Sequence, residues 1–600
     1  MAWYDEAVFY HIYPLGLAGA PKQNDYGEPV HRLNTLLPWV DHIKEIGGSA
    51  LYIGPLFESV GHGYETTDYK KLDSRLGTNE DLTAFVAYCH EQGIKVIFDG
   101  VFNHTGRDFF AFKDIQANRE NSQYKDWYCN VNFWGNNEYN DGFSYDNWGG
   151  YNLLVKLNQK NPAVVDYICD VIRFWVSEFD VDGIRLDAAD VLDFDFMKAL
   201  RRTANEVKPD FWLMGEVIHG DYSRWVNGET LHSVTNYTLH KALYSGHNDH
   251  NYFEIAHTVR RLQNMGTLKL YNFVDNHDVE RIYTKLTNKA HFAPVHVLLY
   301  TLPGVPSIYY GSEFGIEGRK EYGSDDSLRP ALNIEDYKDS VKTNPCTALI
   351  AALGKVRQAV PALSYGSYDE LMLTNRQFAY ARDLDGTRVI VSVNNDDAPA
   401  GMHLAAGNCT AYIGALSGEK VSVQDGHINI TQPANSGEIW VPDGTDLNVK
   451  PVKMETKAKN KTESEAKTNT ENKAASETAT DAKGNKEAEP KIESKGIVTA
   501  TESADAKKNT TNTEKNISAA NEVKDSAKDA SAQAAADTPV DPETITVDWS
   551  KSPESMTVPE LQAAILAKLA GNGPVDAQMK KTVTDNIWHD SLVNWLKSFR

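Results

Sequence analysis

The segment Val96-Ile-Phe-Asp99-Gly-Val-Phe-Asn103-His104 joins a short apolar run to an acidic residue. An apolar run of this length is typical of a buried strand. Three later segments repeat the arrangement: Gly183-Ile-Arg185-Leu-Asp187, Phe211-Trp-Leu-Met-Gly-Glu216-Val217 and Leu270-Tyr-Asn-Phe-Val-Asp-Asn276-His277-Asp278. A carboxylate at the end of a buried strand is costly as structure, yet the C-terminal ends of parallel strands are where a (β/α)8 barrel carries its chemistry. The four segments therefore predict an α/β fold with an acidic active site at the rim of such a barrel.

The wider pattern agrees with a barrel. Apolar strands alternate with amphipathic helical stretches from about residue 7 to about residue 357, which is typical of βα units on a parallel sheet. We therefore assign residues 1–357 to a catalytic (β/α)8 TIM barrel. The connection after the third strand is about twice as long as usual, and its residues 104–157 are rich in aromatic residues, Asn and Gly. We assign them to a subdomain inserted after strand 3.

The pattern changes after the barrel. Short β runs separated by turns fill residues 358–447, which we assign to an antiparallel β-sandwich. Residues 448–541 contain no aromatic side chain and are dominated by Lys, Glu, Thr, Ala, Asn and Ser. Such a segment cannot bury enough apolar surface to offset the entropy of its chain, so we predict a disordered linker.

Residues 542–600 are predicted to be ordered again, as a helical module. Thr557-Val-Pro-Glu560 has the spacing of a capping box and precedes an apolar stripe. A second apolar stripe follows, and together the stripes predict a helical hairpin. Its helices either pack against each other or dock on a protein partner, for which residues 557–600 are the candidate surface. The aromatic members of the second stripe are Trp588, Trp595 and Phe599.

Composition narrows the classes of partner and compartment. The 600 residues carry a formal net charge of -23, which argues against nucleic acid, because a phosphate backbone needs a basic surface. The five cysteines are scattered without a CxxC pair, as expected for reduced thiols. We find no apolar run that predicts a membrane span and no secretory leader before the first strand, so we expect a cytoplasmic protein. Nucleotide-binding and zinc-protease motifs are also absent.

The four acidic segments resemble, almost residue for residue, the signature regions of the α-amylase family (family 13) of retaining glycoside hydrolases. The resemblance covers roughly the first three quarters of the chain. Within the family, Leu154-Val-Lys-Leu-Asn158 is most similar to the neopullulanase and cyclomaltodextrinase group. Further matching segments are Phe9-Tyr-His-Ile-Tyr-Pro14, Ala50-Leu-Tyr-Ile-Gly-Pro55, His62-Gly-Tyr64-Glu-Thr-Thr-Asp68-Tyr69, Ile308-Tyr-Tyr-Gly-Ser-Glu313 and Asp325-Asp-Ser-Leu-Arg329-Pro330.

The resemblance implies three catalytic carboxyl groups. Asp187 would be the nucleophile, Glu216 the acid and base, and Asp278 the group that binds sugar hydroxyls and distorts the ring. The residue types support this division. Arg185 projects from the same strand face two residues before Asp187, so its permanent charge should keep Asp187 ionised. Glu216 follows an apolar run, so burial should raise its pKa and keep it protonated.

The resemblance also implies a set of substrate-binding residues, and Arg185 is one of them. His104 and His277 would bind hydroxyls of the sugar at the scissile bond, and Tyr64 would be the aromatic floor beneath it. Asp325 and Arg329 would hold the next glucose, unless they form only a surface ion pair. Aromatic faces of the insert either stack on sugar rings or simply hold this loop-rich segment together. The two residues implied to support the site are Asp99 and Asn103.

Departures from the family bear on metal binding and specificity. Asp190-Val191 replaces the Lys-His pair that follows the nucleophile in α-amylases. A position that would bind calcium is lost with it, so we predict no metal and no other cofactor. Ile218 replaces the tryptophan that follows the acid/base in the neopullulanase group, and that group's N-terminal β-domain has no counterpart here. The resemblance therefore leaves action on α-1,6 links open.

These inferences predict a hydrolase that cleaves α-1,4-glucosidic bonds in maltodextrins, starch fragments or cyclodextrins through a covalent glycosyl-enzyme. The alternative enzyme is a transglycosylase of the same family, in which a sugar hydroxyl replaces water as the acceptor. The alternative of another class is an inactive amylase-like scaffold that binds glycans.

Overall fold

The computed structural model describes residues 2–266, 268–321, 324–447, 547, 549, 551–553, 556–570, 583 and 596. The chain divides into two compact units, one ending at Gly496 and one beginning at Ile497. The predicted linker, residues 448–541, lies outside the described residues.

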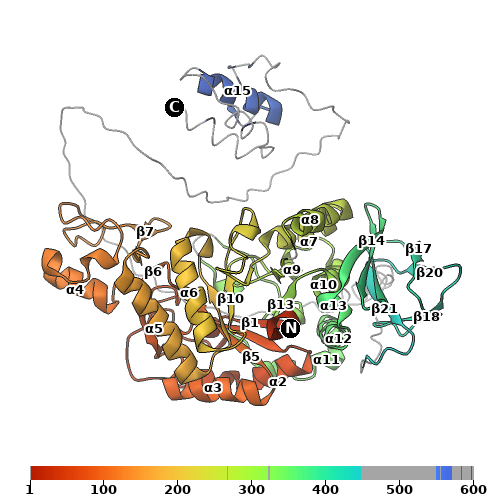
Figure 1. Cartoon of the computed structure of the whole chain (residues 1–600), viewed down its shortest axis with the longest axis horizontal. Coiled ribbons are helices and arrows are strands. Elements are labelled where there is room, and N and C mark those ends of the chain that lie inside the picture. Colours follow the sequence, from red (N-terminus) through yellow and green to blue (C-terminus); the bar gives the residue numbers. More distant parts are fainter. Residues whose placement is uncertain are drawn as a thin grey trace, which may run out of the picture. The chain divides into compact units, whose positions relative to one another are not determined.

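Eight parallel strands form the central sheet of the first unit (Figure 1). Their order is β11-β10-β9-β5-β2-β1-β13-β12, and a parallel bridge between Thr235 and Tyr271 joins the two ends of the sheet. The sheet therefore closes into the predicted barrel. The strands are β1 Phe9–Ile12, β2 Ala50–Ile53, β5 Lys95–Gly100, β9 Gly183–Leu186, β10 Trp212–Gly215, β11 Ser233–Val234, β12 Tyr271–Asn272 and β13 Val305–Tyr309.

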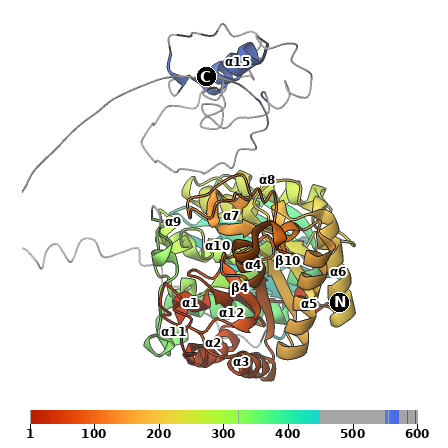
Figure 2. The same cartoon turned by 90° about the vertical axis from the view of Figure 1, so that its left-hand side faces the viewer.

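Helices surround this sheet (Figures 1 and 2). Local signals fix their ends: Thr78 and Asp81 form a capping box at the start of α3, and Asn161 caps α5, whose first residue is Pro162. The longer helices are α2 Leu37–Glu45, α3 Asn79–Glu91, α5 Pro162–Phe179, α6 Phe194–Val207, α7 Tyr237–Asn248, α8 Tyr252–Asn264, α10 Phe292–Thr301 and α12 Pro345–Ala359. The short ones are α1 Pro14–Leu17, α9 Ile282–Lys285, α11 Ser340–Thr343 and α13 Ala362–Tyr365.

The barrel interior is filled by large side chains. Alternate strand residues point inward, and among them Trp212 stacks on Phe9 with 5.0 Å between ring centroids. Tyr52, Met214 and Tyr271 belong to the same buried cluster. This packed interior excludes water and forms a rigid base for residues at the strand ends.

The inserted segment holds a small antiparallel sheet and one helix, β6 His104–Thr105, β7 Asn147–Trp148, β8 Tyr151–Lys156 and α4 Phe110–Asn118. Its aromatic residues divide between two environments. Phe143 and Tyr145 are buried, whereas Trp134 is 98% exposed and Tyr151 63% exposed. The first strand of this sheet carries His104 next to the barrel rim.

The part that follows the barrel is an antiparallel β-structure, as predicted. A six-stranded sheet, in the order β14-β15-β16-β21-β18-β19, packs through one buried cluster against the pair β17–β20. The strands are β14 Ser367–Leu373, β15 Gln377–Leu384, β16 Thr387–Asn394, β17 Ala400–Ala405, β18 Ala411–Gly414, β19 Lys420–Ser422, β20 His427–Gln432 and β21 Ser436–Pro442.

Two buried arginines lie where this sandwich meets the barrel, and Arg382 joins the two. Arg357 of α12 donates to the carbonyl of Tyr300 at 2.6 Å, and Arg382 of β15 donates to the carbonyl of Thr301 at 2.6 Å. Both acceptors belong to the C-terminal end of α10, where the helix dipole is negative. No carboxylate among the described residues pairs with either guanidinium. Burial lowers the pKa of Arg357 to about 9 and that of Arg382 to about 10.

The second unit contains α15, Val558–Ala570. The Thr557 N–H donates to the Glu560 carboxylate at 2.7 Å, which confirms the predicted helix start. Of the second predicted stripe, only Val583 and Leu596 are described, and both are buried in one cluster with α15 side chains. Trp588, Trp595 and Phe599 lie outside the described residues. In the described part of the chain no helix has the length and apolar character of a membrane span.

We predict that removing the residues after Leu447 leaves the thermal unfolding midpoint of the barrel unchanged. The barrel of the shortened chain should unfold at the same temperature as the barrel of the full chain. The strands of the first unit end at Pro442, and the described apolar cluster of the second unit is built only from its own residues. Differential scanning calorimetry of both chains measures this midpoint. A drop of more than about 4 °C in the shorter chain, which would correspond to roughly 1–2 kcal/mol, would contradict the prediction.

Asp182, the residue before β9, is buried below the barrel, away from the strand ends that carry the acids. Its carboxylate lies 2.7 Å from His90 Nε2, 2.9 Å from Lys95 Nζ and 3.0 Å from Lys208 Nζ, and it accepts from the Val96 N–H at 2.9 Å. Burial alone would raise its pKa, but these donors hold the pKa of Asp182 well below its usual range.

Asp182→Asn should therefore lower the free energy of unfolding by about 2 kcal/mol at pH 7, because an amide cannot replace the charge that these donors share. A depressed carboxyl pKa adds stability above the unfolded pKa of about 4, and this stability is lost as the pH falls towards the folded pKa. The difference between variant and wild type should therefore shrink below about pH 4. Urea unfolding of the variant and the wild type, at pH 7 and below about pH 4, measures this difference in the free energy of unfolding. The matched control is Asp170→Asn, which removes an exposed partner of Lys70 and should have no measurable effect.

Candidate active site

The four acidic segments meet at one rim of the barrel. Asp99 is the penultimate residue of β5, Asp187 follows β9 directly and Glu216 follows β10 directly. Asp278 lies in the loop after β12. The parallel register pairs Asp99 with Arg185 of β9, so both side chains lie at the same height on the sheet. All of these strands end at the same rim, and the site is where the sequence predicts it.

One guanidinium connects three of the carboxylates. Arg185 Nη1 lies 2.9 Å from Asp99 Oδ1 and 3.0 Å from Asp187 Oδ1, and Arg185 Nη2 lies 2.9 Å from Glu216 Oε1. The Arg185 side chain is only 3% exposed. Glu216 also accepts from the Ala188 N–H at 3.1 Å. Asp187 and Glu216 are thus held on the two terminal nitrogens of a single, rigid side chain.

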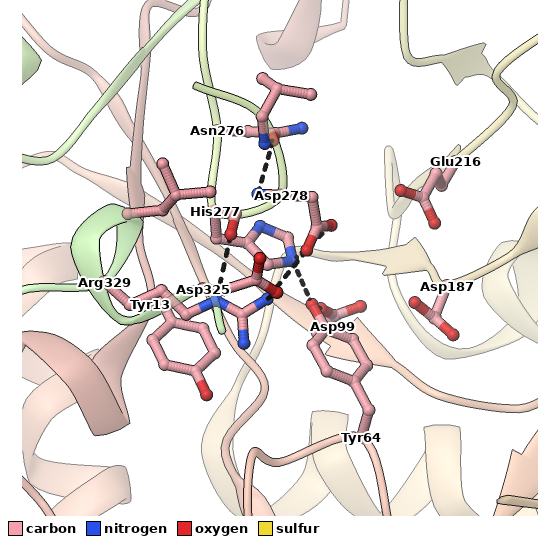
Figure 3. A network of polar contacts seen from close by, with 12 residues as sticks. Tyr13, Tyr64, Asp99, Asp187, Glu216, Asn276, His277, Asp278, Asp325 and Arg329 are labelled. Atoms are coloured by element: carbon pink, nitrogen blue, oxygen red, sulfur yellow. Dashed lines mark hydrogen bonds and ion pairs between the residues drawn. The ribbon is translucent and has the colours of Figure 1, made fainter. Parts of the chain in front are cut away.

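Asp278 faces Asp187 and Glu216 from the other side of the site (Figure 3). Arg329 Nη2 lies 2.9 Å from Asp278 Oδ1 and 3.0 Å from Asp325 Oδ2, and Arg329 Nε donates to the His277 carbonyl at 3.0 Å. The Arg329 side chain is 13% exposed. Arg329 and Asp325 are therefore no mere surface ion pair, because Arg329 is largely buried and also positions Asp278.

Aromatic rings form the wall beside Asp278. Tyr64 stacks on His277 with 5.7 Å between ring centroids, and its hydroxyl contacts His277 Nε2 and donates to Asp99 at 3.1 Å. His104, which is buried, has its Nε2 at 3.1 Å from the Tyr64 carbonyl. The Asn103 amide group donates to His104 Nδ1 at 3.2 Å. The structure thus brings both predicted histidines to Tyr64. His277 lies against the Tyr64 ring, and His104 lies beside the Tyr64 backbone carbonyl.

Burial and charge set the protonation of these groups. Burial raises the pKa of both Asp187 and Glu216, and the neighbouring carboxylates raise them further, whereas Arg185 opposes the shift. Each of the two groups therefore holds a proton more tightly than a carboxyl group in water does. At Asp278, burial alone would raise the pKa, but the His277 ring, which is charged only at low pH, and Arg329 outweigh it and lower the pKa to about 2.

The expectation that Arg185 holds the pKa of Asp187 down is wrong for the free protein. The pKa of Asp187 is raised rather than lowered, because Arg185 divides its charge among three carboxylates and cannot offset the burial of each. The expected rise in the pKa of Glu216 is confirmed, and burial is its main cause. Burial also lowers the pKa of His277 to about 3 and of His104 to about 4, so both rings are neutral near pH 7.

Three further residues belong to the site, although the sequence analysis assigns none of them a role. The Tyr237 hydroxyl donates to Glu216 Oε1 at 3.3 Å, the Tyr52 hydroxyl donates to Asp99 Oδ2 at 2.8 Å, and Lys320 Nζ donates to the Asp278 carbonyl at 3.0 Å. Tyr237 stands at the start of α7, shortly after β11. Its place just after a strand end is the one signal in the sequence that could have indicated it.

The site shows no arrangement of ligands for a metal ion. Within the described ranges, no group of three or more His, Cys, Asp or Glu side chains is placed to bind one. The Asn103 Oδ1 atom is buried without a hydrogen-bond partner, but a single amide oxygen does not make a calcium site, which takes six to eight oxygen ligands. Among the described residues, His, Cys, Asp and Glu side chains thus form no such cluster at the base of the insert.

The arrangement provides what the hydrolysis of an acetal with retention requires. Two carboxyl groups that share one guanidinium can act as nucleophile and proton donor, and the raised pKa of Glu216 suits it to protonate a leaving oxygen. Asp278 and Arg329, on the opposite side, can accept and donate hydrogen bonds to sugar hydroxyls. Tyr64 adds an aromatic face between the two sides.

Comparison with known proteins agrees with this geometry. The family model described as the catalytic domain of alpha amylase matches residues 32–355. A cyclomaltodextrinase from Bacillus sp. is 31% identical over 422 residues, which are 66% of this chain and 74% of the relative. Neopullulanase 2 from Thermoactinomyces vulgaris is 29% identical over 473 residues, which are 73% of this chain and 78% of the relative.

The solved structures include a cyclomaltodextrinase with a TM-score of 0.66 and 27% identity, covering 73% of this chain and 78% of the other. The match to the family model spans more than half of this chain and contains all four acidic segments. The chain therefore belongs to the alpha-amylase family.

Proposed function

We propose that the protein is a retaining glycoside hydrolase that cleaves α-1,4-glucosidic bonds in maltodextrins, starch fragments or cyclodextrins. The observation that carries this proposal is the Arg185 guanidinium, which holds Asp187 and Glu216 side by side with Asp278 opposite. A retaining mechanism needs its two carboxyl groups about 5–5.5 Å apart, and the contacts of Arg185 with both hold Asp187 and Glu216 close to each other. The convergence of all these groups argues against an inactive scaffold.

The first step forms the covalent intermediate. As Glu216 donates its proton to the glycosidic oxygen, Asp187 attacks the anomeric carbon, and the carbon–oxygen bond to the leaving sugar breaks. The negative charge on Glu216 that results is stabilised by Arg185 Nη2 and by the N–H of Ala188. Loss of the Glu216 proton is thus balanced by donors that are already in place.

The second step releases the product. Glu216 removes a proton from water, whose oxygen attacks the same carbon and displaces Asp187 as a carboxylate. Asp278 and Arg329 hold the sugar during both steps, and neutral His277 can donate to a hydroxyl without adding charge. A sugar hydroxyl in place of water would give transfer rather than hydrolysis.

We further propose that the enzyme works in the cytoplasm without a metal cofactor. The five cysteines all lie in the described ranges and all are free thiols, which supports a reducing compartment. The steps above use only side chains and water. A relative from Bacillus subtilis, 28% identical over 418 residues, carries the name intracellular maltogenic amylase.

Asp187→Asn and Glu216→Gln should each lower turnover of maltoheptaose by about 10³-fold or more, because each removes a covalent or a proton-transfer step. Reducing-sugar release measures turnover, circular dichroism confirms the fold, and the exposed Glu229→Gln serves as the control.

Freshly released sugar should be the α-anomer by NMR. Initial β-anomer, or near-normal turnover in either variant, would show that the roles are misassigned, and products longer than maltoheptaose would indicate transfer.

Prolonged dialysis against a strong chelator should leave the rate on maltoheptaose essentially unchanged, since Val191 and its surroundings offer no set of calcium ligands. The rate is compared before dialysis, after dialysis and after calcium is restored. Complete loss that calcium reverses would place a metal site in the insert and contradict the proposal.

A further inference from the structure

Arg329 lies in a loop rather than in a barrel strand, so other contacts must fix its place. Two adjacent, fully buried tyrosines at the end of β13 hold the carbonyl groups on either side of it. The Tyr309 hydroxyl donates to the Leu328 carbonyl at 2.9 Å, and the Tyr310 hydroxyl donates to the Pro330 carbonyl at 2.9 Å. The backbone that carries Arg329 is therefore attached to the barrel on both sides of the residue.

A buried arginine adds a third donor to this loop. Arg281 Nη2 donates to the Leu328 carbonyl at 3.1 Å, and Arg281 Nη1 donates to the Tyr310 carbonyl at 2.8 Å. Arg281 is fully buried and lies three residues after Asp278 in the chain. It therefore joins the loop of Asp278, the end of β13 and the loop of Arg329 in one hydrogen-bonded unit.

The same unit reaches the residues that precede Asp278. Arg281 Nη1 also donates to Ser312 Oγ at 3.0 Å, and Ser312 Oγ donates to Asp275 Oδ2 at 2.8 Å. Asp275 Oδ2 accepts a further hydrogen bond from the Ile282 N–H at 2.8 Å. All of these side chains are buried, so a shift of one loop against the other would leave polar groups unpaired away from water.

Helix α1 and the residue before it close another side of Arg329. A Cβ atom at Gly16 would come within 2.4 Å of the Arg329 carbonyl, so the glycine leaves the space that this carbonyl needs. The Arg329 guanidinium lies over the Tyr13 ring, 4.7 Å from its centroid (Figure 3). Backbone and side chain are thus both held in the position from which Arg329 Nη2 reaches Asp278.

We propose that Arg281, Tyr309 and Tyr310 are positioning residues, which fix the Arg329 guanidinium where it binds the sugar beside Asp278. They act through the backbone of the Arg329 loop. The inference rests on the proposed function, in which Arg329 holds the sugar, and deepens it by naming the groups that give this loop its geometry. It also gives a role to the two tyrosines, which lie in a segment that resembles the family and had none.

The test removes the two hydroxyl groups and keeps both rings. Tyr309→Phe combined with Tyr310→Phe should raise KM for maltoheptaose by about 10-fold, because a small displacement of Arg329 weakens its hold on the sugar. The value of kcat should fall by less than about 2-fold, since a group that holds the sugar throughout both steps contributes equally to the ground state and the transition state. Arg281→Met should give the same division between KM and kcat.

Two further variants separate positioning from folding. Tyr380→Phe removes another buried hydroxyl, which lies 2.5 Å from Thr301 Oγ1 between barrel and sandwich, and should change neither constant. Arg329→Ala should itself raise KM by about 10-fold or more, through lost charge-assisted hydrogen bonds. In that background the two tyrosine changes should raise KM by less than about 2-fold further, because the group that they position is gone.

The outcomes separate this inference from the function on which it rests. With an active wild type, an unchanged KM in the double tyrosine variant overturns the positioning role alone, and this variant decides even where Arg281→Met fails to fold. A lower kcat at unchanged KM also overturns it, because a partly unfolded population gives that result. So does an equal rise in KM with and without Arg329, or an Arg329→Ala variant with wild-type KM. A wild-type protein inactive on maltoheptaose overturns the proposed function and this inference together.

Discussion

The site depends on one buried cation that serves three carboxylates. Asp99, Asp187 and Glu216 repel one another at short range in a place with little water, and the Arg185 guanidinium contacts all three. This guanidinium reaches all three because the register of the parallel strands sets Arg185 opposite Asp99. The closure of the barrel is therefore a condition of the chemistry, since the register of β5, β9 and β10 fixes these distances.

The other half of the site depends on loops rather than on strands. Asp278, Asp325 and Tyr64 all lie outside the barrel strands, and Arg329 and the His277 ring connect them. The acids that break the bond are thus rigidly positioned by the sheet, whereas the groups that bind the sugar are positioned by contacts between loops. Because of this division, changes in the loops can alter which substrate binds without moving the reacting groups.

The sequence predicted the barrel and its acids because both leave local signals. Val96-Ile-Phe before Asp99 is readable as a strand, and a carboxylate at its end is readable as chemistry. Lys320 leaves no such signal, because it joins the site through tertiary packing that no periodicity encodes. The pKa of Asp187 was misjudged for the same reason: the sequence shows that Arg185 is near, but not that Glu216 and Asp99 share it. The aromatic residues of the insert gave no indication either that Phe143 would be buried and Trp134 exposed.

The two arginines at the end of α10 have a consequence for how the chain evolves and is degraded. Among the described residues, the hydrogen-bond acceptors of the buried cations Arg357 and Arg382 are peptide carbonyls. A sandwich taken from another protein would not supply Arg382, and the Thr301 carbonyl that it satisfies would remain buried and unpaired. The β-sandwich is therefore not an interchangeable module. It is inherited with its barrel, and a protease that cuts the connection between them would leave two halves still bound to each other.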